Sequence, residues 1–313
     1  MKVFYQLADF PHLPMPIVTS GTFDGVHRGH QAILERIKEI AYKENGQTVL
    51  ITYEPHPRLV LSPNENLQLL NSLEEKIELL AQNGIEYLLV IPFTPAFSQL
   101  SSREFIQKIL IETVQTKKLV IGFDHRFGKG REGSFEYLKA HEHEYPFEIQ
   151  EIPRQDIENE KISSTRIRHA LSEGRISEAN KLLGRYYTLK GKVVKGDQLG
   201  RAIGFPTANL QISYPHKLVP KQGVYAAFVW VNSQRYEAML YIGRRPVLQN
   251  SELRIEANLL NFNGNLYDQS LTIEIVAWVR EDMSFQNLES LQHQIHLDKQ
   301  QITALLQQEA VQK

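Results

Sequence analysis

The sequence predicts an α/β domain followed by a small all-β domain that ends in a helix. In residues 1–183, strand-like and helix-like segments alternate, which is typical of a parallel sheet with helices on its faces. In residues 184–313, short β-rich runs follow one another without intervening helices, which favours a barrel or a sandwich. The length of 313 residues also agrees with two domains, and we place the boundary near Gly184.

The first domain shows apolar runs and helical periodicity in turn. Strands are expected at 15–21, 48–55, 87–93, 117–123 and 147–153. Helices are expected at 29–44, 74–82 and about 101–113. In the first of these helices, apolar residues recur at helical spacing: Ile33, Leu34, Ile37, Ile40 and Ala41.

The second domain is expected to consist of strands until its last segment. Its β-rich runs lie at 189–196, 224–243 and 253–280, and turn signals divide the longer runs at Asn232-Ser233 and Asn263-Gly264. Residues from about 284 to 308 have the apolar spacing of a helix.

The composition excludes several classes of protein. The chain has no cysteine, which excludes disulfides, thiolate zinc sites, iron–sulfur clusters and cysteine nucleophiles. Its net charge is −1 and neither half is strongly basic, so no nucleic-acid partner is expected. No apolar run approaches the ~18 residues of a membrane helix, and residues 1–16 lack the apolar stretch of a signal peptide. We therefore expect a cytoplasmic protein with no membrane partner, and the sequence carries no signal for an oligomeric state.

The string GTFDGVHRGH (21–30) lies where the first strand turns into the first helix. Ligands of open α/β sheets bind beyond the carboxyl ends of the strands, and a helix N-terminus there attracts phosphate. His27 and His30 are three residues apart at this helix start, so both rings can face one phosphate. Imidazole donors there can stabilise charge that develops on a transferred phosphoryl group. On its own, His-x-x-His is more often a pair of surface residues or half of a metal site.

Two later segments also suit polyphosphate. GFDHRFGKGREG (122–133) follows an expected strand and is rich in glycine and basic residues. ISSTRIR (162–168) places three hydroxyl residues at a helix start and two arginines in the first turns. Such caps and arginines can hold polyphosphate, although an N-capped surface helix would have the same pattern.

The most specific string is GKVVKGDQLGRAIGFPTANL (191–210). Its glycines, Gly196, Gly200 and Gly204, allow backbone N–H groups to point at phosphates. Thr207 and Asn209 lie two residues apart on an extended segment, so their side chains point the same way and offer hard oxygen ligands to Mg²⁺. A β-hairpin with glycine bulges would explain the glycines but not the Pro-Thr-Ala-Asn sequence.

In this order the strings resemble the prokaryotic bifunctional riboflavin kinase/FMN adenylyltransferase (FAD synthetase) family, and the resemblance covers nearly the whole chain. It implies a Rossmann-like nucleotidyltransferase domain at 1–183 and a flavokinase-type β-barrel with a C-terminal helix at 184–313. It also implies that the second domain phosphorylates riboflavin to FMN with ATP. The first domain would join AMP from a second ATP to FMN, which yields FAD and pyrophosphate.

The resemblance assigns roles to the residues that match the family's motifs. His27 and His30 would act on the α-phosphate of ATP, and Glu256 in RIEANLL would be the base that deprotonates the ribityl hydroxyl of riboflavin. Read from its spacing alone, Glu256 is a solvated strand residue. His56, in YEPHP (53–57), and Arg280 would contact the flavin. ATP and its phosphates would contact Gly21, Phe23, Asp24, Gly25, Asp124, Ser163, Ser164, Thr165, Arg168, Gly196, Gly200, Gly204, Thr207 and Asn209, and Thr207 and Asn209 would also bind Mg²⁺.

The chain departs from the family's pattern near both sites. Tyr241 and Val247 stand where the family has the Asn and the last Thr of Asn-Ile-Gly-x-x-Pro-Thr. Asn258 stands in place of a His two residues after the base, and His125 in place of a Phe. Two other functions therefore stay open: a nucleotidyltransferase with one activity on another phosphorylated acceptor, and a flavin-binding regulator whose kinase site has drifted. The intact HRGH, PTAN and Glu256 favour the two-reaction enzyme.

Overall fold

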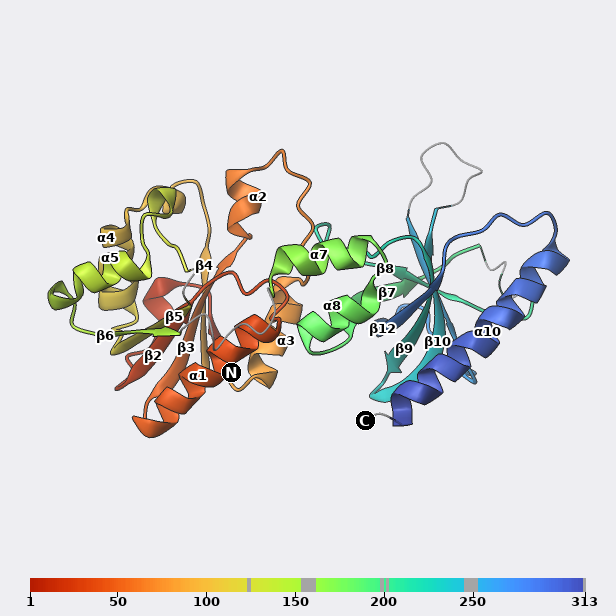
Figure 1. Ribbon diagram of the computed structural model, residues 1–313, viewed down its shortest axis with the longest axis horizontal. Coiled ribbons are helices and arrows are strands. Elements are labelled where there is room, and N and C mark those ends of the chain that lie inside the picture. Colours follow the sequence, from red (N-terminus) through yellow and green to blue (C-terminus); the bar gives the residue numbers. More distant parts are fainter. Residues whose placement is uncertain (123–124, 153–161, 198–199, 201–202, 245–252, 312–313) are drawn as a thin grey trace. The chain divides into compact units, whose positions relative to one another are not determined.

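The computed structural model describes residues 1–122, 125–152, 162–197, 200, 203–244 and 253–311. Contacts divide the chain into two compact units, Met1–Ser164 and Thr165–Lys313, and each is described by itself (Figure 1). Most of helix α7 (Ser164–Ser172) and all of helix α8 (Ile176–Leu183) fall in the second unit, whereas they lie before the boundary predicted near Gly184. The amide of Asn180 explains this placement of α8, because it donates to the carbonyl of Ile275 in the second unit at 2.9 Å.

The first unit contains a parallel sheet of six strands. Their spatial order is β1 (Lys2–Phe4), β4 (Tyr87–Pro92), β3 (Gln47–Glu54), β2 (Pro16–Ser20), β5 (Lys118–Gly122) and β6 (Glu148–Ile152). The strand order reverses between β2 and β5, which is the position where open α/β sheets bind ligands beyond the strand ends. The loops that begin after Ser20 and after Gly122 therefore meet at the expected ligand site.

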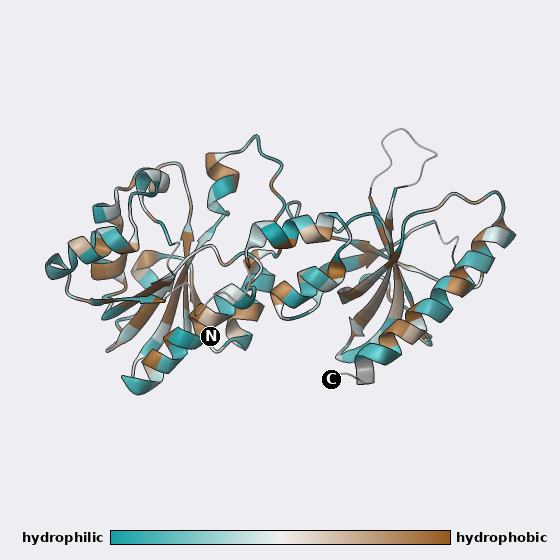
Figure 2. Ribbon diagram, viewed as in Figure 1, coloured by the Kyte–Doolittle hydropathy of each residue, from teal (hydrophilic) through white to brown (hydrophobic). Residues whose placement is uncertain are grey.

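Both faces of this sheet are buried. Successive residues of its strands are therefore apolar, without the alternation of apolar and polar residues that a half-exposed strand shows (Figure 2). One face packs against α1 (Arg28–Lys43) and α3 (Leu73–Gln82), through residues such as Ile17, Leu50, Leu34, Ile37 and Leu80. The other face packs against α4 (Ser102–Phe105), a π-helical segment (Ile106–Thr113) and α5 (Phe135–Ala140), through residues such as Val18, Ile51, Phe105, Ile109 and Leu138. A short helix, α2 (Pro57–Leu61), follows β3.

The second unit contains a closed antiparallel barrel. Its strands lie in the order β10 (Gln234–Gly243), β11 (Arg254–Leu259), β8 (Ala208–Gln211), β7 (Tyr187–Val194), β12 (Ser270–Arg280) and β9 (Gly223–Val231). Helix α10 (Leu288–Val311) covers one side of the barrel, where Ile302 and Leu306 pack on Phe228, Met239 and Val276. This arrangement confirms the predicted fold class in both halves of the chain.

The differences from the predicted elements have local causes. Strands β1 and β8 were not expected, because three or four residues are too few to show an alternating pattern. The helix expected at 101–113 starts as α4 and continues as a π-helical segment. A backbone bond between residues five apart is characteristic of this change: the Val114 N–H donates to the Ile109 carbonyl at 3.0 Å.

A buried ion pair joins the end of β12 to α10. The Arg280 guanidinium donates through Nε and Nη2 to the Asp298 carboxylate at 2.7–3.1 Å, and the two side chains are only 18% and 5% exposed. Removing one partner from such a pair leaves an uncompensated buried charge.

We therefore expect Asp298→Asn to lower the free energy of unfolding of the second unit by about 3–5 kcal/mol. Urea denaturation followed by tryptophan fluorescence measures this unit selectively, because Trp230 and Trp278 both lie in it. Glu281→Gln is the control: it removes an exposed ion pair with Lys221 and should cost at most about 1 kcal/mol. Equal losses in the two variants would contradict the prediction.

Candidate active sites

The loop between β2 and α1 is tightly turned and closely packed. Phe23, Gly25 and Val26 all have positive φ angles of 49°, 86° and 38°. A Cβ atom at Gly25 would lie 2.6 Å from a methyl carbon of Leu70, so only glycine fits this position. The backbone N–H of Gly21 donates to the carbonyl of Ile51 at 3.0 Å and so fixes the start of the loop on the neighbouring strand β3.

The two histidines of the HRGH string lie together at the start of α1. His27 is the N-cap of the helix, and its Nδ1 accepts a hydrogen bond from the backbone N–H of His30 at 3.3 Å. The two rings stack with centroids 3.7 Å apart and planes 13° apart. Because Nδ1 of His27 accepts, the proton of the neutral ring lies on Nε2, which is then a donor. The structure thus brings His27 and His30 together as predicted.

Polar side chains form hydrogen bonds that hold the loop between β2 and α1 in place. The Asp24 carboxylate accepts from the backbone N–H of Leu70 at 2.9 Å, and the amide oxygen of Asn71 accepts from the backbone N–H of Gly25. The Ser164 hydroxyl donates to the Asp24 carbonyl at 2.9 Å. Asp24 is 2% exposed, so the structure shows it as a support of the loop, and its contact with ATP stays a prediction.

A buried lysine on α3 lies near the same loop. Lys76 is 4% exposed, and its Nζ lies 3.5 Å from the Thr52 hydroxyl. Burial lowers the pKa of Lys76, while the nearby charges of Asp24 and Glu54 oppose this shift. Sequence reasoning missed Lys76 because a lysine on an amphipathic helix is ordinarily solvated.

A chain of polar side chains spans the carboxyl ends of β3, β2 and the loop after β5. The Ser20 hydroxyl lies 3.1 Å from Nε2 of His125 and also forms a hydrogen bond with Tyr53. Burial and, to a smaller extent, the charges of Arg126 and Arg131 together lower the pKa of His125 to about 4. His125 is therefore neutral at pH 7 and bonds across the point where the strand order reverses.

The other residues predicted for the first reaction are placed as follows. Nδ1 of His56 caps α2 by accepting from the backbone N–H of Arg58 at 3.2 Å, and its contact with flavin stays a prediction. Ser163 is exposed just before α7, and Thr165 and Arg168 lie on α7 in the second unit. Asp124 lies outside the described residues.

The barrel brings Thr207, Asn209 and Glu256 together although nearly fifty residues separate them in the chain. Asn209 on β8 pairs with Glu256 on β11, and it also pairs with Val194 on β7. The Thr207 hydroxyl donates to Oε2 of Glu256 at 3.0 Å. Glu256 is thus no isolated edge residue, because it contacts the PTAN string directly.

The glycines of the string 191–210 permit close packing around these residues. A Cβ atom at Gly196 would overlap the side-chain amide of Asn209, and one at Gly200 would overlap the carbonyl oxygen of Phe205. The Gly200 carbonyl accepts from the backbone N–H groups of Ile203 and Phe205 at 3.2 and 2.8 Å. Gly204 has a φ angle of 85°, which favours glycine.

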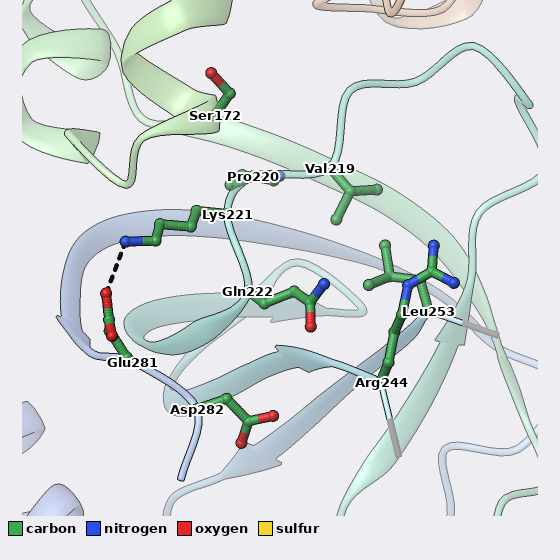
Figure 3. A pocket seen from close by; sticks show the side chains of 9 residues that line it. All are labelled: Ser172, Val219, Pro220, Lys221, Gln222, Arg244, Leu253, Glu281 and Asp282. Carbon is green, nitrogen blue, oxygen red and sulfur yellow. Dashed lines mark hydrogen bonds and ion pairs between the residues drawn. The ribbon is translucent and has the colours of Figure 1, made fainter. Parts of the chain in front are cut away.

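A pocket of about 570 Å³ lies at one end of the β10–β11 ladder (Figure 3). Arg244 and Leu253 continue the two strands beyond their last pair, and at one side of the lining Lys221 forms an ion pair with Glu281 at 2.9 Å. Tyr241, which pairs with Glu256 in this ladder, donates from its hydroxyl to Asp282 at 2.9 Å. The full lining is Ser172, Val219, Pro220, Lys221, Gln222, Arg244, Leu253, Glu281 and Asp282.

Comparisons with known proteins show the family to which each half of the chain belongs. The family model described as FAD synthetase matches residues 11–166, and the one described as riboflavin kinase matches residues 183–306. A bifunctional riboflavin kinase/FMN adenylyltransferase of Listeria monocytogenes is 38% identical over 290 residues, which cover 92% of this chain and 91% of that protein. The chain belongs to the bifunctional riboflavin kinase/FMN adenylyltransferase family.

Other members and structures extend this likeness. The Escherichia coli K12 bifunctional riboflavin kinase/FMN adenylyltransferase is 34% identical over 302 residues, 96% of either chain. A solved structure described as a macrolide-efflux protein of Streptococcus pneumoniae is 31% identical, with a TM-score of 0.86 over 96% of this chain and 97% of that one. Within the described part of the present chain, no helix is long and apolar enough to cross a membrane.

Three family departures are hydrogen-bonded in this member of the riboflavin kinase/FMN adenylyltransferase family. His125 bonds to Ser20 and Tyr241 to Asp282, as described above, and the side-chain amide of Asn258 donates to the Pro206 carbonyl at 2.7 Å. None of these partners lies near in the chain, so no local pattern in the sequence could indicate these bonds. Val247, a fourth departure, lies outside the described residues.

The lowered pKa of His125 predicts how the stability of the first unit depends on pH. Because the folded pKa of about 4 lies below the ordinary 6.5, the unfolded chain binds more protons between these values, and the free energy of unfolding of the first unit falls as the pH is lowered from 6.5 to 4. His125→Phe removes this contribution and flattens the profile in that window. Hydrogen–deuterium exchange of peptides from β2 and β5, corrected for intrinsic exchange rates, measures the change.

His143→Gln is the matched control, since His143 is an exposed histidine of the same unit. It should follow the wild-type profile. Parallel profiles for the wild type and His125→Phe would contradict the assigned pKa.

Proposed function

We propose that His27 and His30 serve the adenylyl transfer of this enzyme and that Glu256, Thr207 and Asn209 serve its kinase reaction. As a family member, the protein is an enzyme of FAD biosynthesis with two activities. The observation that carries the assignment is that each set of side chains gathers within one unit: the histidine pair in the first, and the Thr207–Glu256 bond in the second. We assign the two functions to residues 1–183 and 184–313.

In the kinase reaction, Glu256 would accept the proton of the ribityl 5′-hydroxyl while that oxygen attacks the γ-phosphorus of ATP. ADP leaves with the bond electrons, and FMN is the product. The hydrogen bond from Thr207 supports this role, because it holds the carboxylate in place through one oxygen and leaves the other for the substrate. The glycines at 196, 200 and 204 would let the loop approach the phosphates.

The donor set of this site fits Mg²⁺. Thr207 and Asn209 offer a hydroxyl and an amide oxygen on one side of β8, next to the carboxylate of Glu256. Mg²⁺ is ordinarily held by few protein oxygens together with substrate phosphates. Bound there, it would neutralise the charge of the β- and γ-phosphates.

In the adenylyl transfer, a phosphate oxygen of FMN would attack the α-phosphorus of a second ATP, and pyrophosphate would leave. The Nε2–H of His27 supports a role in donating to the α-phosphate oxygens, where negative charge grows in the transition state. His30 would act beside it. The remaining proposed contacts of ATP and pyrophosphate are Gly21, Phe23, Asp24, Gly25, Asp124, Ser163, Ser164, Thr165 and Arg168.

For the flavin of the kinase reaction we propose the pocket at the end of the β10–β11 ladder. Its lining combines the apolar Val219 and Leu253 with the charged Arg244, which suits an aromatic ring system with polar edges. Arg280 directly precedes two lining residues, and its guanidinium also donates to the Glu281 carbonyl at 2.8 Å. In the adenylyl transfer, His56 would contact the flavin.

Substitutions should separate the two reactions. We expect His27→Ala to lower FAD formation from FMN by at least about 10²-fold, because one donor to the developing charge is lost, while FMN formation from riboflavin is unchanged. Glu256→Gln should lower riboflavin phosphorylation by about 10²–10⁴-fold and leave FAD formation from supplied FMN intact. His143→Ala, at an exposed histidine, should change neither rate. A folded His27 or Glu256 variant that loses both activities would rule out the division into two sites.

A timed assay of the full chain tests the function as a whole. With riboflavin, ATP and Mg²⁺, chromatography should show FMN rising first and FAD following at its expense. FMN without FAD would mean that the first domain is inactive or uses another acceptor. FAD from supplied FMN, but no product from riboflavin, would mean that the departures near Tyr241 and Asn258 have abolished the kinase. Flavin binding without turnover of either substrate would indicate the regulator.

A further inference from the structure

Asn258 occupies a buried position beside the proposed kinase residues. It lies on β11 two residues after Glu256, and its side chain is 8% exposed. Its Nδ2 donates to the Pro206 carbonyl at 2.7 Å. Asn258 stands where the family's pattern has a histidine, and here its side-chain amide supplies the donor of this bond.

The bond lies where the strand pairing ends. The β8–β11 ladder contains the pairs Glu256–Asn209 and Ala257–Ala208 and stops there. Continuing the same register would bring Asn258 opposite Thr207, but these two residues are not paired in the ladder. Beyond the last backbone pair, the side-chain amide of Asn258 holds the Pro206–Thr207 peptide unit against β11 through its bond to the Pro206 carbonyl.

This peptide unit sets the position of the Thr207 hydroxyl, which donates to Glu256 at 3.0 Å. Another support on this segment is a backbone bond from Phe205 to the Gly200 carbonyl, at the far side of Pro206. Proline has no N–H group, so the backbone of Pro206 can form a hydrogen bond only through its carbonyl. The Asn258 bond therefore restrains the residue that directly precedes the proposed ATP ligand.

We propose that Asn258 is a positioning residue of the kinase site, which holds the Pro206–Thr207 peptide so that Thr207 faces both Glu256 and ATP. The inference rests on the proposed roles of Thr207 and Glu256. Asn258 itself touches neither substrate, and its action is transmitted through the backbone of residue 206.

The test measures riboflavin phosphorylation by the full chain, with KM for ATP and kcat determined separately. Asn258→Leu keeps the approximate size of the side chain but removes the donor, and it should raise KM for ATP about tenfold, as expected for the loss of one hydrogen bond. KM for riboflavin should change less than twofold. Asn258→His restores an N–H donor and should return KM for ATP to within about threefold of the wild type.

Two controls separate positioning from a loss of folding. FAD formation from supplied FMN reports on the other site and should be unchanged in every variant. Asn265→Leu removes an amide that accepts from the backbone N–H of Tyr267 in an exposed turn, so it breaks a comparable bond away from the site. It should leave KM for ATP unchanged. If Asn258→Leu does not fold, Asn258→Asp replaces it, since it keeps the shape and substitutes an oxygen for the donor.

Each outcome of this test either supports or overturns the inference. An unchanged KM for ATP in a folded Asn258→Leu or Asn258→Asp variant overturns the inference, as does an increase in KM for riboflavin alone. Failure of Asn258→His to recover KM for ATP also overturns it. If the wild type does not phosphorylate riboflavin, the proposed kinase function itself fails, and this result is distinguishable because it is seen before any substitution is made.

Discussion

The loops at both candidate sites depend on buried polar side chains that hold the backbone where the strands end. Beyond Ser20 and before Ala208 the chain has left its ladder, so its N–H and C=O groups need other partners. Asp24 and Asn71 provide such bonds in the first unit, and Asn258 does so in the second. Groups fixed in this way need not reorganise when charge moves in the reaction, which is the basis of electrostatic stabilisation of a transition state.

In the first unit, charged groups lie close to the hydrogen bonds that hold the loop 21–27. The N-terminus of α1 and the buried Lys76 both contribute positive potential near the loop 21–27, and Asp24 and Glu54 partly balance it. The Asp24 carboxylate has a second task, because it also accepts from the Leu70 backbone. Asp24 is thus both a counter-charge to Lys76 and a support of the loop. It therefore couples the position of the loop to the charge state of Lys76.

The fold could be predicted from the sequence to the extent that burial leaves a periodic pattern. The strands β2 to β6 are long enough to show apolar runs, and α1 shows its buried face directly. The closure of the barrel and the pairing of Glu256 with Asn209 are not local properties, and only the family resemblance indicated that these residues share a site. The supporting roles of Asn71 and Asn258 were missed because each acts through a residue distant in the chain, and Lys76 was missed because a lysine on an amphipathic helix is ordinarily solvated.

The described departures from the family share a feature that bears on whether the kinase site has drifted. A buried polar side chain that replaces another residue costs free energy unless it finds a partner. Asn258 is buried and bonds to Pro206, and the half-buried His125 and Tyr241 bond to Ser20 and Asp282. Substitutions that accumulate after a site has lost its function are under no requirement to make such bonds with the elements that form it. The bonds at Asn258 and Tyr241 instead tie β11 and β10 to the PTAN string and to the segment after β12, so the replacements maintain the arrangement around Glu256 with different side chains.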